Sequence, residues 1–424
     1  MIRKTVFFLF TFIIPTYVHA QDNRQLQNTF MEAEYFFMNE EYSEALNLYL
    51  QIYQERSNNA NIAFQIGVCY LNIPGKKDLA VKYLEAAAEN MSARRKEGTV
   101  TQTAAPYDAL YELARAYRIN YNFDKAREVF SRYRETLLPD DKENLEFIDH
   151  EIHVCETAKA LMNTPISFTS ENAGELFNDE KNNYNPLISA DGKTFAYMTS
   201  LKFYNAIMIS RFQNNKWSGP VNIYPDLQTD GDINISSLSK DGNTIYMSRD
   251  DNSNSDIFSS NFTGITWSAA AKLNKNINTK YWESHAAISE DGNMLVFASD
   301  RPGGFGGLDL YISGKVNGEW GPAVNLGPTI NSSLNEDRPF FGNHDKLLIF
   351  SSQGHNNMGG YDLFSSVRLS GGSWDKAVNM GYPLNTPDDD FWFMPVNDGN
   401  TGYIFGEKEG KGFGKNDIYN IKLK

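Results

Sequence analysis

The sequence is poor in the residues that most often carry chemistry or cross-links. It has two cysteines, Cys69 and Cys155, and six histidines among 424 residues. Because both cysteines lie in helical patterns, we expect two buried free thiols, with a Cys69–Cys155 disulfide as the alternative. A framework of several disulfides is therefore excluded. The few histidines show no ligand spacing, so we predict no metal site.

Motifs for nucleophilic catalysis and for nucleotide binding are also missing. The chain has neither a Gly-x-Ser-x-Gly elbow nor a Gly-Lys-Ser/Thr phosphate loop. The glycine-rich stretch Gly303–Gly307 leads into the strand-like run LDLYIS, whereas a phosphate loop leads into a helix. We expect no cofactor, and we predict that these glycines belong to a long hairpin that needs positive φ or close packing.

Apolar runs of the ~20 residues needed to cross a bilayer are absent. One short run, Val6 to Ile14, follows Arg3 and Lys4 and precedes Val18-His19-Ala20. This order predicts a secretory signal peptide over residues 1–20, with cleavage before Gln21 and no lipid-bearing cysteine after it. The net charge of −14 argues against nucleic acid or an anionic membrane as the main partner. We therefore expect an exported protein with no direct membrane insertion.

The first half of the chain, residues 21–162, has the apolar spacing of amphipathic helices. Small residues recur at regular places in it: Ala33, Ala45, Ala63, Gly67, Ala80, Ala114 and Ala126. A proline, Pro139, follows the last of them. This pattern resembles the tetratricopeptide repeat, in which small residues lie where two helices cross. We predict three repeats, an insertion at Ser92–Ala105, and a capping helix over Asp140–Met162.

The resemblance implies a concave groove lined by the first helix of each repeat. The residues predicted to line it are Phe30, Glu34, Phe37, Phe64, Asn72, Tyr111, Arg115 and Arg118. One interpretation is a groove that binds a peptide or a protein, and the other is that several of these side chains only pack between helices.

The second half, residues 165–424, repeats a set of short phrases about every fifty residues. Each unit has an Asp-Gly turn or a degraded form of it between two strand-like runs, and four units carry a tryptophan: Trp217, Trp267, Trp320 and Trp374. Four strands per unit are typical of a propeller blade. We predict five blades, the last completed by the strand Pro165–Gly174. Six blades are the alternative if Glu175–Asn185 contains another strand.

These phrases resemble the TolB-type, WD40-like propeller repeat, most specifically in SDRPGGFGGLDLY and in Trp320 to Gly327. The order of helical repeats followed by a propeller is similar to the front half of PorE-like envelope proteins of Bacteroidota. The resemblance implies a periplasmic scaffold of an outer-membrane machine such as type IX secretion. Relatives of that kind continue into an OmpA-like domain that grips peptidoglycan, and the given sequence shows none.

Two groups of propeller residues are candidates for function. Acids that precede the innermost strands are expected near the channel mouth: Asp232, Glu283, Asp337 and Asp390. Such acids can cleave glycans, but acids repeated at equivalent places are more typical of turn caps. Loops on one propeller face form the second group, with Arg301, Phe305, His355, Asn356, Met358 and Phe413 as predicted contact residues.

The sequence therefore favours a non-enzymatic scaffold or adaptor in the periplasm, peripherally associated with the outer membrane. Its predicted partners are envelope proteins, chiefly subunits of an outer-membrane-associated complex. The first alternative is a glycan-binding or glycan-cleaving propeller, and the second is a peptidoglycan adaptor.

Overall fold

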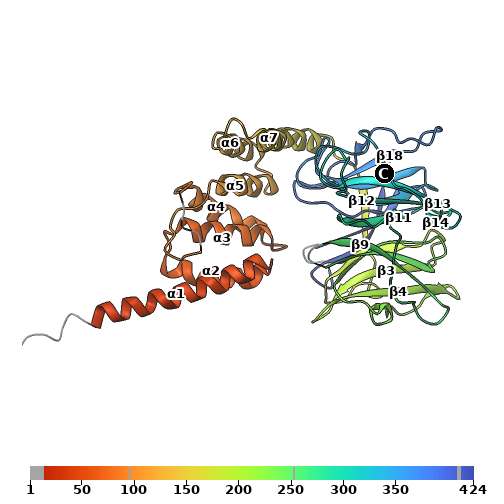
Figure 1. Cartoon of the computed structure of the whole chain (residues 1–424), viewed down its shortest axis with the longest axis horizontal. Coiled ribbons are helices and arrows are strands. Elements are labelled where there is room, and N and C mark those ends of the chain that lie inside the picture. Colours follow the sequence, from red (N-terminus) through yellow and green to blue (C-terminus); the bar gives the residue numbers. More distant parts are fainter. Residues whose placement is uncertain (1–13, 95, 97, 252–253, 408–411) are drawn as a thin grey trace, which may run out of the picture. The chain divides into compact units, whose positions relative to one another are not determined.

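The computed structural model describes residues 14–94, 96, 98–251, 254–407 and 412–424, with side chains described from residue 23 onward. The chain forms two compact units, Met1–Glu156 and Thr157–Lys424, the first helical and the second built of strands (Figure 1). The predicted signal peptide lies outside the residues whose side chains are described.

The helical unit is built from consecutive helices, and the first six pack each against the next. The seventh is joined to the sixth by the ion pair of Arg134 with Asp149 at 2.6 Å. The pairs α1–α2, α3–α4 and α5–α6 are the most extensive contacts. The helices are α1 (Ile14–Met38), α2 (Tyr42–Glu55), α3 (Ala60–Leu71), α4 (Ala80–Ala88), α5 (Asp108–Ile119), α6 (Phe123–Arg134) and α7 (Lys142–Asn163), with a short 3₁₀ turn, η1 (Lys77–Leu79), before α4. The predicted order, helices followed by a propeller, is confirmed.

Small residues allow these helices to approach closely. The predicted small positions are all buried, and Ala33, Ala45 and Ala80 are completely so. A Cβ atom on Gly67 of α3 would overlap the side chain of Leu84 on α4. The pattern of small residues therefore marks the helix crossings, while membership of the tetratricopeptide family remains a prediction from the sequence.

The segment between α4 and α5 is anchored to earlier helices. Val100 is 1% exposed. Its N–H donates to Oε1 of Gln27 on α1 at 3.0 Å, and its carbonyl accepts from Nδ2 of Asn59 at 3.3 Å. The insertion predicted at Ser92–Ala105 thus connects the start of the unit to its middle. Cys69 and Cys155 are both free and buried, and burial raises the pKa of Cys155 to about 11.

The second unit contains five antiparallel sheets among the described residues. In four of these sheets the strand that comes first in the chain is the innermost, and in the remaining sheet the innermost strand is β20 (Met394–Val396). These inner strands contact one another. The first blade has β2 (Asn183–Ile188), β3 (Thr194–Ser200), β4 (Asn205–Gln213), β5 (Lys216–Trp217) and β6 (Val221–Asn222), and the second has β7 (Asp232–Leu238), β8 (Thr244–Asp250), β9 (Ser255–Asn261) and β10 (Ala271–Lys272). A short 3₁₀ helix, η2 (Tyr224–Leu227), lies between them.

The remaining blades repeat this arrangement. The third has β11 (Glu283–Ile288), β12 (Met294–Ser299), β13 (Asp309–Val316), β14 (Glu319–Trp320) and β15 (Val324–Asn325); the fourth has β16 (Glu336–Gly342), β17 (Leu347–Ser352), β18 (Asp362–Val367) and β19 (Val378–Asn379); the fifth has β20 (Met394–Val396), β21 (Thr401–Gly406), β22 (Asp417–Leu423) and β1 (Phe168–Asn172).

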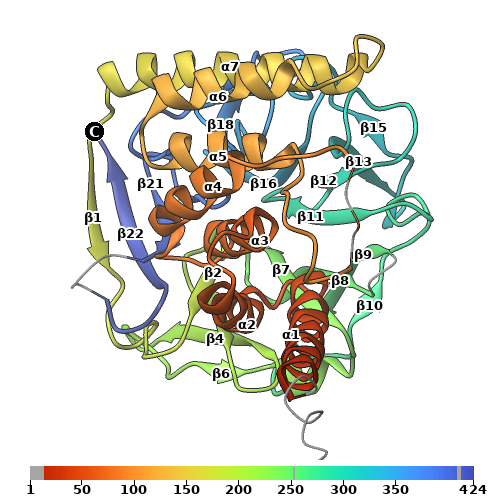
Figure 2. The ribbon, with the colours of Figure 1, turned by 90° about the vertical axis from the view of Figure 1, so that its left-hand side faces the viewer.

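The fifth blade is completed by β1, which pairs antiparallel with β22 from Phe168↔Leu423 to Asn172↔Tyr419 (Figure 2). This confirms the predicted closing strand. In the described chain, the stretch 175–185 contributes only the start of β2, so the six-bladed alternative is wrong.

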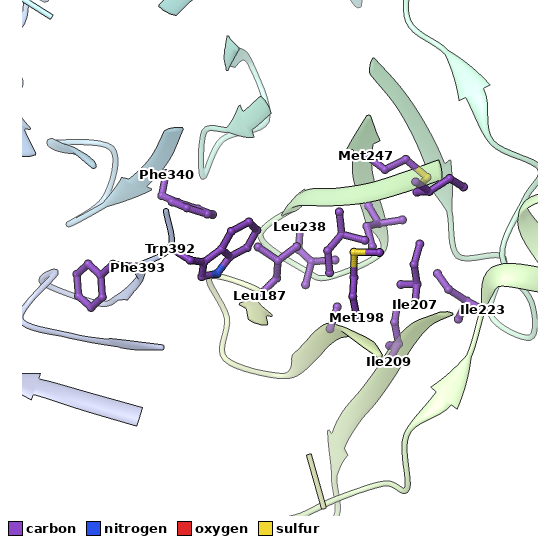
Figure 3. Packing of buried hydrophobic residues seen from close by; sticks show 14 of the residues in the cluster. Leu187, Met198, Ile207, Ile209, Ile223, Leu238, Met247, Phe340, Trp392 and Phe393 are labelled. Carbon is purple, nitrogen blue, oxygen red and sulfur yellow. The ribbon is translucent and has the colours of Figure 1, made fainter. Parts of the chain in front are cut away.

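The core of the propeller extends across the channel between blades. Trp392 lies 4.8 Å, centroid to centroid, from the Phe340 ring of the fourth blade (Figure 3). Its Nε1 donates to the carbonyl of Pro186 in the first blade at 2.9 Å. Leu187 and Leu238 belong to the same buried cluster. Trp392, just before β20 of the fifth blade, therefore connects that blade to both of its neighbours.

Candidate functional site

Three acids at the starts of the inner strands have the same structural task. Glu283 accepts hydrogen bonds from the backbone N–H and the hydroxyl of Thr279, both at 2.7 Å. Glu336 accepts from N–H and hydroxyl of Ser332 at 2.8 and 2.5 Å, and Asp390 accepts from the same two groups of Thr386. Each carboxylate fixes the turn that enters its blade. Burial raises the pKa of Glu336 to about 7.

Two of the four predicted channel acids do not belong to this repeated set. The equivalent of Glu283 in the fourth blade is Glu336, because both pair with the last residue of the second strand and cap the same turn. Asp337 is one residue further along, and Asp232 is exposed at the start of β7, where the described residues show no capping bond to its entry turn. The expectation of equivalent places is therefore corrected: Glu283 and Asp390 are caps, whereas Asp337 breaks the repeat.

Asp337 faces the third blade. It accepts a hydrogen bond from the hydroxyl of Ser284 at 2.6 Å, and its two oxygens each lie 3.3 Å from Nδ1 of His285. The backbone N–H of Arg338 also donates to it, at 2.8 Å. His285 is 7% exposed, and its ring lies edge-on to Trp392 with centroids 6.3 Å apart. The result is a buried imidazole–carboxylate pair between two blades.

Charge interactions hold Asp337 ionised. Burial by itself would raise its pKa, but the facing His285, the charge of Arg338 and the Ser284 bond outweigh burial and lower the pKa to about 2. Burial lowers the pKa of Arg338, against the attraction of Asp337. The Arg338 guanidinium lies 4.1 Å from the centroid of the Phe391 ring. The Asp337 carboxylate is thus a fixed anion beside the Arg338 cation. Such an arrangement can orient a polar ligand or a proton.

This cluster was missed because it depends on irregular strands. The pairing of inner with second strands shifts register in the first four blades, at Tyr184/Leu187, Ile235/Ser237, Glu283/Ala286 and Asp337/Phe340. Such bulges re-aim side chains, and bulges are common beside functional sites. The sequence signal was weak: a histidine and an arginine stand where the neighbouring units have other residues.

The glycine-rich loops enclose a buried aspartate. Oxygens of Asp309 accept from the N–H groups of Phe305 and Gly306 at 2.6 and 3.0 Å. Asp362 and Asp417 accept equivalent bonds in the fourth and fifth blades. A Cβ on Gly306 would overlap the carbonyl of Leu334, at the entrance of the next blade. Gly303, by contrast, has open space around it but a φ of 97°. The prediction that these glycines serve positive φ or close packing is therefore confirmed.

The predicted loop contacts fall into two groups. Phe305, Phe413 and Asn356 are exposed, the first two by 50% and 44%. Met358 is fully buried, so it does not contribute to the loop surface. The Arg301 guanidinium lies 3.1 Å from the Glu283 carboxylate, and His355 Nε2 lies 2.8 Å from the carbonyl of Ile330. Both residues therefore hold their loops against the segment that enters the same blade.

Four asparagines that entered no predicted site connect successive blades. Each binds both the N–H and the C=O of one residue in the third strand of the preceding blade: Asn278 to Ile257, Asn331 to Leu310, Asn385 to Leu363, and Asn178 to Ile418. All four are at most 5% exposed. The asparagine amide carries both the donor and the acceptor that such a double bond needs.

The opposite end of the channel, where the Asp-Gly turns lie, has a cavity of about 250 Å³ lined by all five blades. Charged contacts join the blades at its rim. Lys240 Nζ lies 2.6 Å from Glu290, whose other oxygen lies 2.7 Å from His344 Nδ1. Both oxygens of Asp345 accept from the Glu290 N–H at 3.0 Å. These charges are engaged in holding turns together.

The residues predicted for the helical groove are partly structural. Phe30 and Arg118 are 2% and 3% exposed, and Arg118 pairs with Glu151 of α7 at 2.6 Å. Glu34 accepts bonds from the Tyr49 hydroxyl and from Gln65, so it connects α1 to α2 and α3. Tyr111 packs against Phe130, Tyr133 and Phe147, and Arg115 pairs with Glu112 at 2.8 Å. Phe37 and Phe64 are half-buried, and Asn72 is exposed.

Two absences apply to the described residues only. In that part of the chain no group of three or more His, Cys, Asp or Glu side chains is arranged to hold a metal ion. Within the same limits, no helix has the length and hydropathy of a membrane span.

No family model and no curated protein matches the sequence. Solved structures share the propeller at low similarity. TolB from Acinetobacter baumannii is 16% identical over 57% of this chain and 54% of that chain, with a TM-score of 0.38. A putative TolB from Agrobacterium tumefaciens is 14% identical over 57% and 91%, with a TM-score of 0.37. An α-L-arabinofuranosidase from Lactobacillus brevis is 16% identical over 57% and 91%, with a TM-score of 0.40.

These neighbours include proteins of different activity, and the alignment with the first spans about half of that protein's length. The likeness is one of fold, and it carries no argument about function. The five-bladed assignment rests on the sheets of this chain, and any function has to be argued from its own side chains.

Proposed function

We propose that the protein is a non-enzymatic scaffold that binds other proteins of the cell envelope. One observation carries the proposal: large aromatic side chains are exposed on three equivalent loops, between the second and third strands of the first, third and fifth blades. Phe203 is 86% exposed, Phe305 50% and Phe413 44%. Exposed aromatic groups on repeated loops are typical of protein-binding surfaces.

The polar groups of the same loops support this interpretation. The loop aspartates, the entry-turn acids and the asparagines that join blades all bind backbone or neighbouring side chains. The repeated polar residues therefore maintain the ring, and the loop aromatics are left to contact a partner. The helical unit offers a second surface on α1, where Met31, Tyr35 and Met38 are exposed by 60%, 59% and 75% at helical spacing.

We place this activity in the periplasm, with peripheral association to the outer membrane. The support is the signal-like order of basic, apolar and small residues at the start of the chain. The acidic balance disfavours nucleic acid as a partner. Subunits of an outer-membrane-associated complex are the partners that we propose.

The test is crosslinking in intact cells, followed by affinity purification and quantitative mass spectrometry. The variant carries Phe203→Asp, Phe305→Asp and Phe413→Asp together, and the matched control is Ile265→Asp. Ile265 is 90% exposed on the turn between β9 and β10, at the other end of its blade. We expect the triple variant to lose about tenfold of a specific partner and the control to retain it.

Recovery of no envelope protein by the wild type above an untagged strain would overturn the proposal. Equal recovery by wild type and triple variant would remove the loops as the binding surface. Circular dichroism of the purified variants establishes that each is folded.

A further inference from the structure

The end of the channel that carries the Asp-Gly turns has a partly apolar cavity that the loop aromatics do not reach. Each blade contributes an apolar side chain to its lining: Ile188, Leu238, Ile288, Phe340 and Val396. Its volume is about 250 Å³. An apolar cavity of roughly 150 Å³ holds a benzene molecule, whereas pockets for drug-sized ligands begin at about 300 Å³. The size therefore fits one large side chain of a partner better than a cofactor.

The rim of this cavity is acidic. Asp191, Glu290 and Asp345 contribute three carboxylates to the lining, against the single ammonium group of Lys240. Lys240 Nζ lies 2.6 Å from one oxygen of Glu290, and His344 Nδ1 lies 2.7 Å from the other. The carboxylates of Asp191 and Asp345 form no ion pair in the part of the chain that the structure describes. The rim therefore keeps a surplus of negative charge.

The Asp345 carboxylate carries its charge in unfavourable surroundings. Both of its oxygens accept from the Glu290 N–H at 3.0 Å. Burial raises the pKa of Asp345, and the charges of Asp291 and Glu290 raise it further, while the charge of Arg368 opposes them. A cation beside Asp345 would offset this repulsion, and such complementarity of charge selects one class of partner over another.

The fourth blade departs from the repeated turn at this rim. In the other four blades the glycine of the Asp-Gly turn has a positive φ, as Gly192 does at 71°. In the fourth blade Asn343, His344 and Asp345 adopt φ values of 48°, 51° and 63°. Residues with a Cβ rarely adopt this conformation, and such strain is concentrated at binding sites. The departure adds an imidazole and a carboxylate to the lining of the cavity.

We propose that the turn end of the channel binds a peptide segment of a partner protein, with one large apolar side chain in the cavity and basic residues on both sides of it. The apolar side chain fills the space between the five blades, and the basic groups pair with Asp191 and Asp345. The loop aromatics lie at the opposite end of the blades, so this surface is separate from theirs. Each surface can therefore be tested without the other.

The test is isothermal titration calorimetry of the full chain at low salt with three acetylated and amidated peptides, KKFKK, KKAKK and EEFEE. We expect KKFKK to bind with a Kd of about 1 mM or tighter. The alanine peptide lacks the side chain for the cavity, and the glutamate peptide meets the acidic rim, so both should bind at least about tenfold more weakly. Added salt should weaken the binding of KKFKK because it screens the charges.

Two variants test the cavity and the rim separately. Val396→Arg places a long cationic side chain in the cavity and should weaken KKFKK by at least about tenfold, whereas its matched control Val221→Arg, 62% exposed on β6, should bind as the wild type does. The double change Asp191→Asn and Asp345→Asn removes the charges and keeps an acceptor oxygen at each site. It should weaken KKFKK by about tenfold, whereas Asp230→Asn, at an exposed site before β7, should have no effect.

Absence of KKFKK binding at ~10 mM overturns the proposal. So does equal binding of KKAKK or EEFEE, or full affinity in both the Val396→Arg and the double aspartate variants. The variant that carries Phe203→Asp, Phe305→Asp and Phe413→Asp should bind KKFKK as the wild type does. Loss of binding there would assign the peptide to the loops and overturn the proposal for the turn end. Near-ultraviolet circular dichroism establishes that each variant is folded.

Discussion

The closing strand of the propeller depends on one asparagine that links the two ends of the ring, and its loss is our principal prediction. Asn178 lies just after β1, and it binds Ile418 on β22 twice. Its Oδ1 accepts from the Ile418 N–H at 2.7 Å, and its Nδ2 donates to the Ile418 carbonyl at 3.0 Å and to Asn172 at 2.8 Å. Asn178 is 3% exposed, so water cannot replace it without rearrangement.

The change Asn178→Ala leaves the buried Ile418 N–H without a partner, whereas the Ile418 carbonyl keeps the bond from the Ala173 N–H at 3.0 Å. At about 1–3 kcal/mol for one such group, we expect a loss of roughly 1–3 kcal/mol in the free energy of unfolding. For a domain of this size, each kcal/mol lowers the midpoint of thermal unfolding by ~2–4 °C. The loss should appear first as faster hydrogen exchange in β1 and β22, because these strands are no longer joined through the following segment.

The assay combines urea unfolding, followed by near-ultraviolet circular dichroism, with hydrogen exchange read by mass spectrometry. Asn331→Ala removes the same two bonds between the third and fourth blades and is the matched interior variant. It should cost a similar free energy without selective exchange in β1. Gln213→Ala, at an exposed site on β4, should change stability by less than ~0.5 kcal/mol. A change this small in Asn178→Ala would refute the argument.

Three further changes test other parts of the argument by the same unfolding assay. Gly306→Ala should destabilise the propeller by about 1–3 kcal/mol, because its Cβ would overlap a backbone carbonyl at the entrance of the next blade. Gly219→Ala, with open space around it, should be neutral. Equal effects of the two changes would contradict the packing argument. Burial raises the pKa of Glu336 from 4.5 to about 7, so between these pH values the folded protein holds a proton that the unfolded chain has lost. The free energy of unfolding should therefore fall by roughly 3 kcal/mol as the pH rises from 4.5 to 7. Glu336→Gln should flatten this pH dependence. Arg118→Ala should cost the helical unit about 3–5 kcal/mol by leaving its buried carboxylate partner unpaired, whereas Arg127→Ala, from an ion pair that is half exposed, should cost less than ~1 kcal/mol.

Much of the architecture could be predicted because its signals are local. The spacing of small and large residues in the first half follows from the period of the helix, and Gly67 marks a crossing in the sequence and in the structure. In the second half, the repeated Asp-Gly turns and tryptophans indicate the length of a blade. The turn needs a positive φ, and Gly192, Gly242 and Gly292 all adopt one. The closing strand followed from counting strands.

The individual residues of the site were harder to predict because they depend on register between strands. In the sequence, Asp337 looks like the equivalent of Glu283, but the pairing of β16 with β17 assigns that place to Glu336. Met358 is in a predicted surface loop, yet its N–H donates to Asp362 and its side chain is buried. Neither outcome is visible in a single stretch of sequence.

The sequence by itself determined the order of helical and β units, the length of the repeated blade unit and the segment that closes the ring, because each follows from a short-range period or a repeated turn. Tertiary structure alone decided which acids are caps and which face another blade. The pairing of His285 with Asp337 needs two bulges in strands about fifty residues apart and the burial of both side chains at one end of a channel. Such a site arises from the packing of blades against one another, which no local pattern encodes.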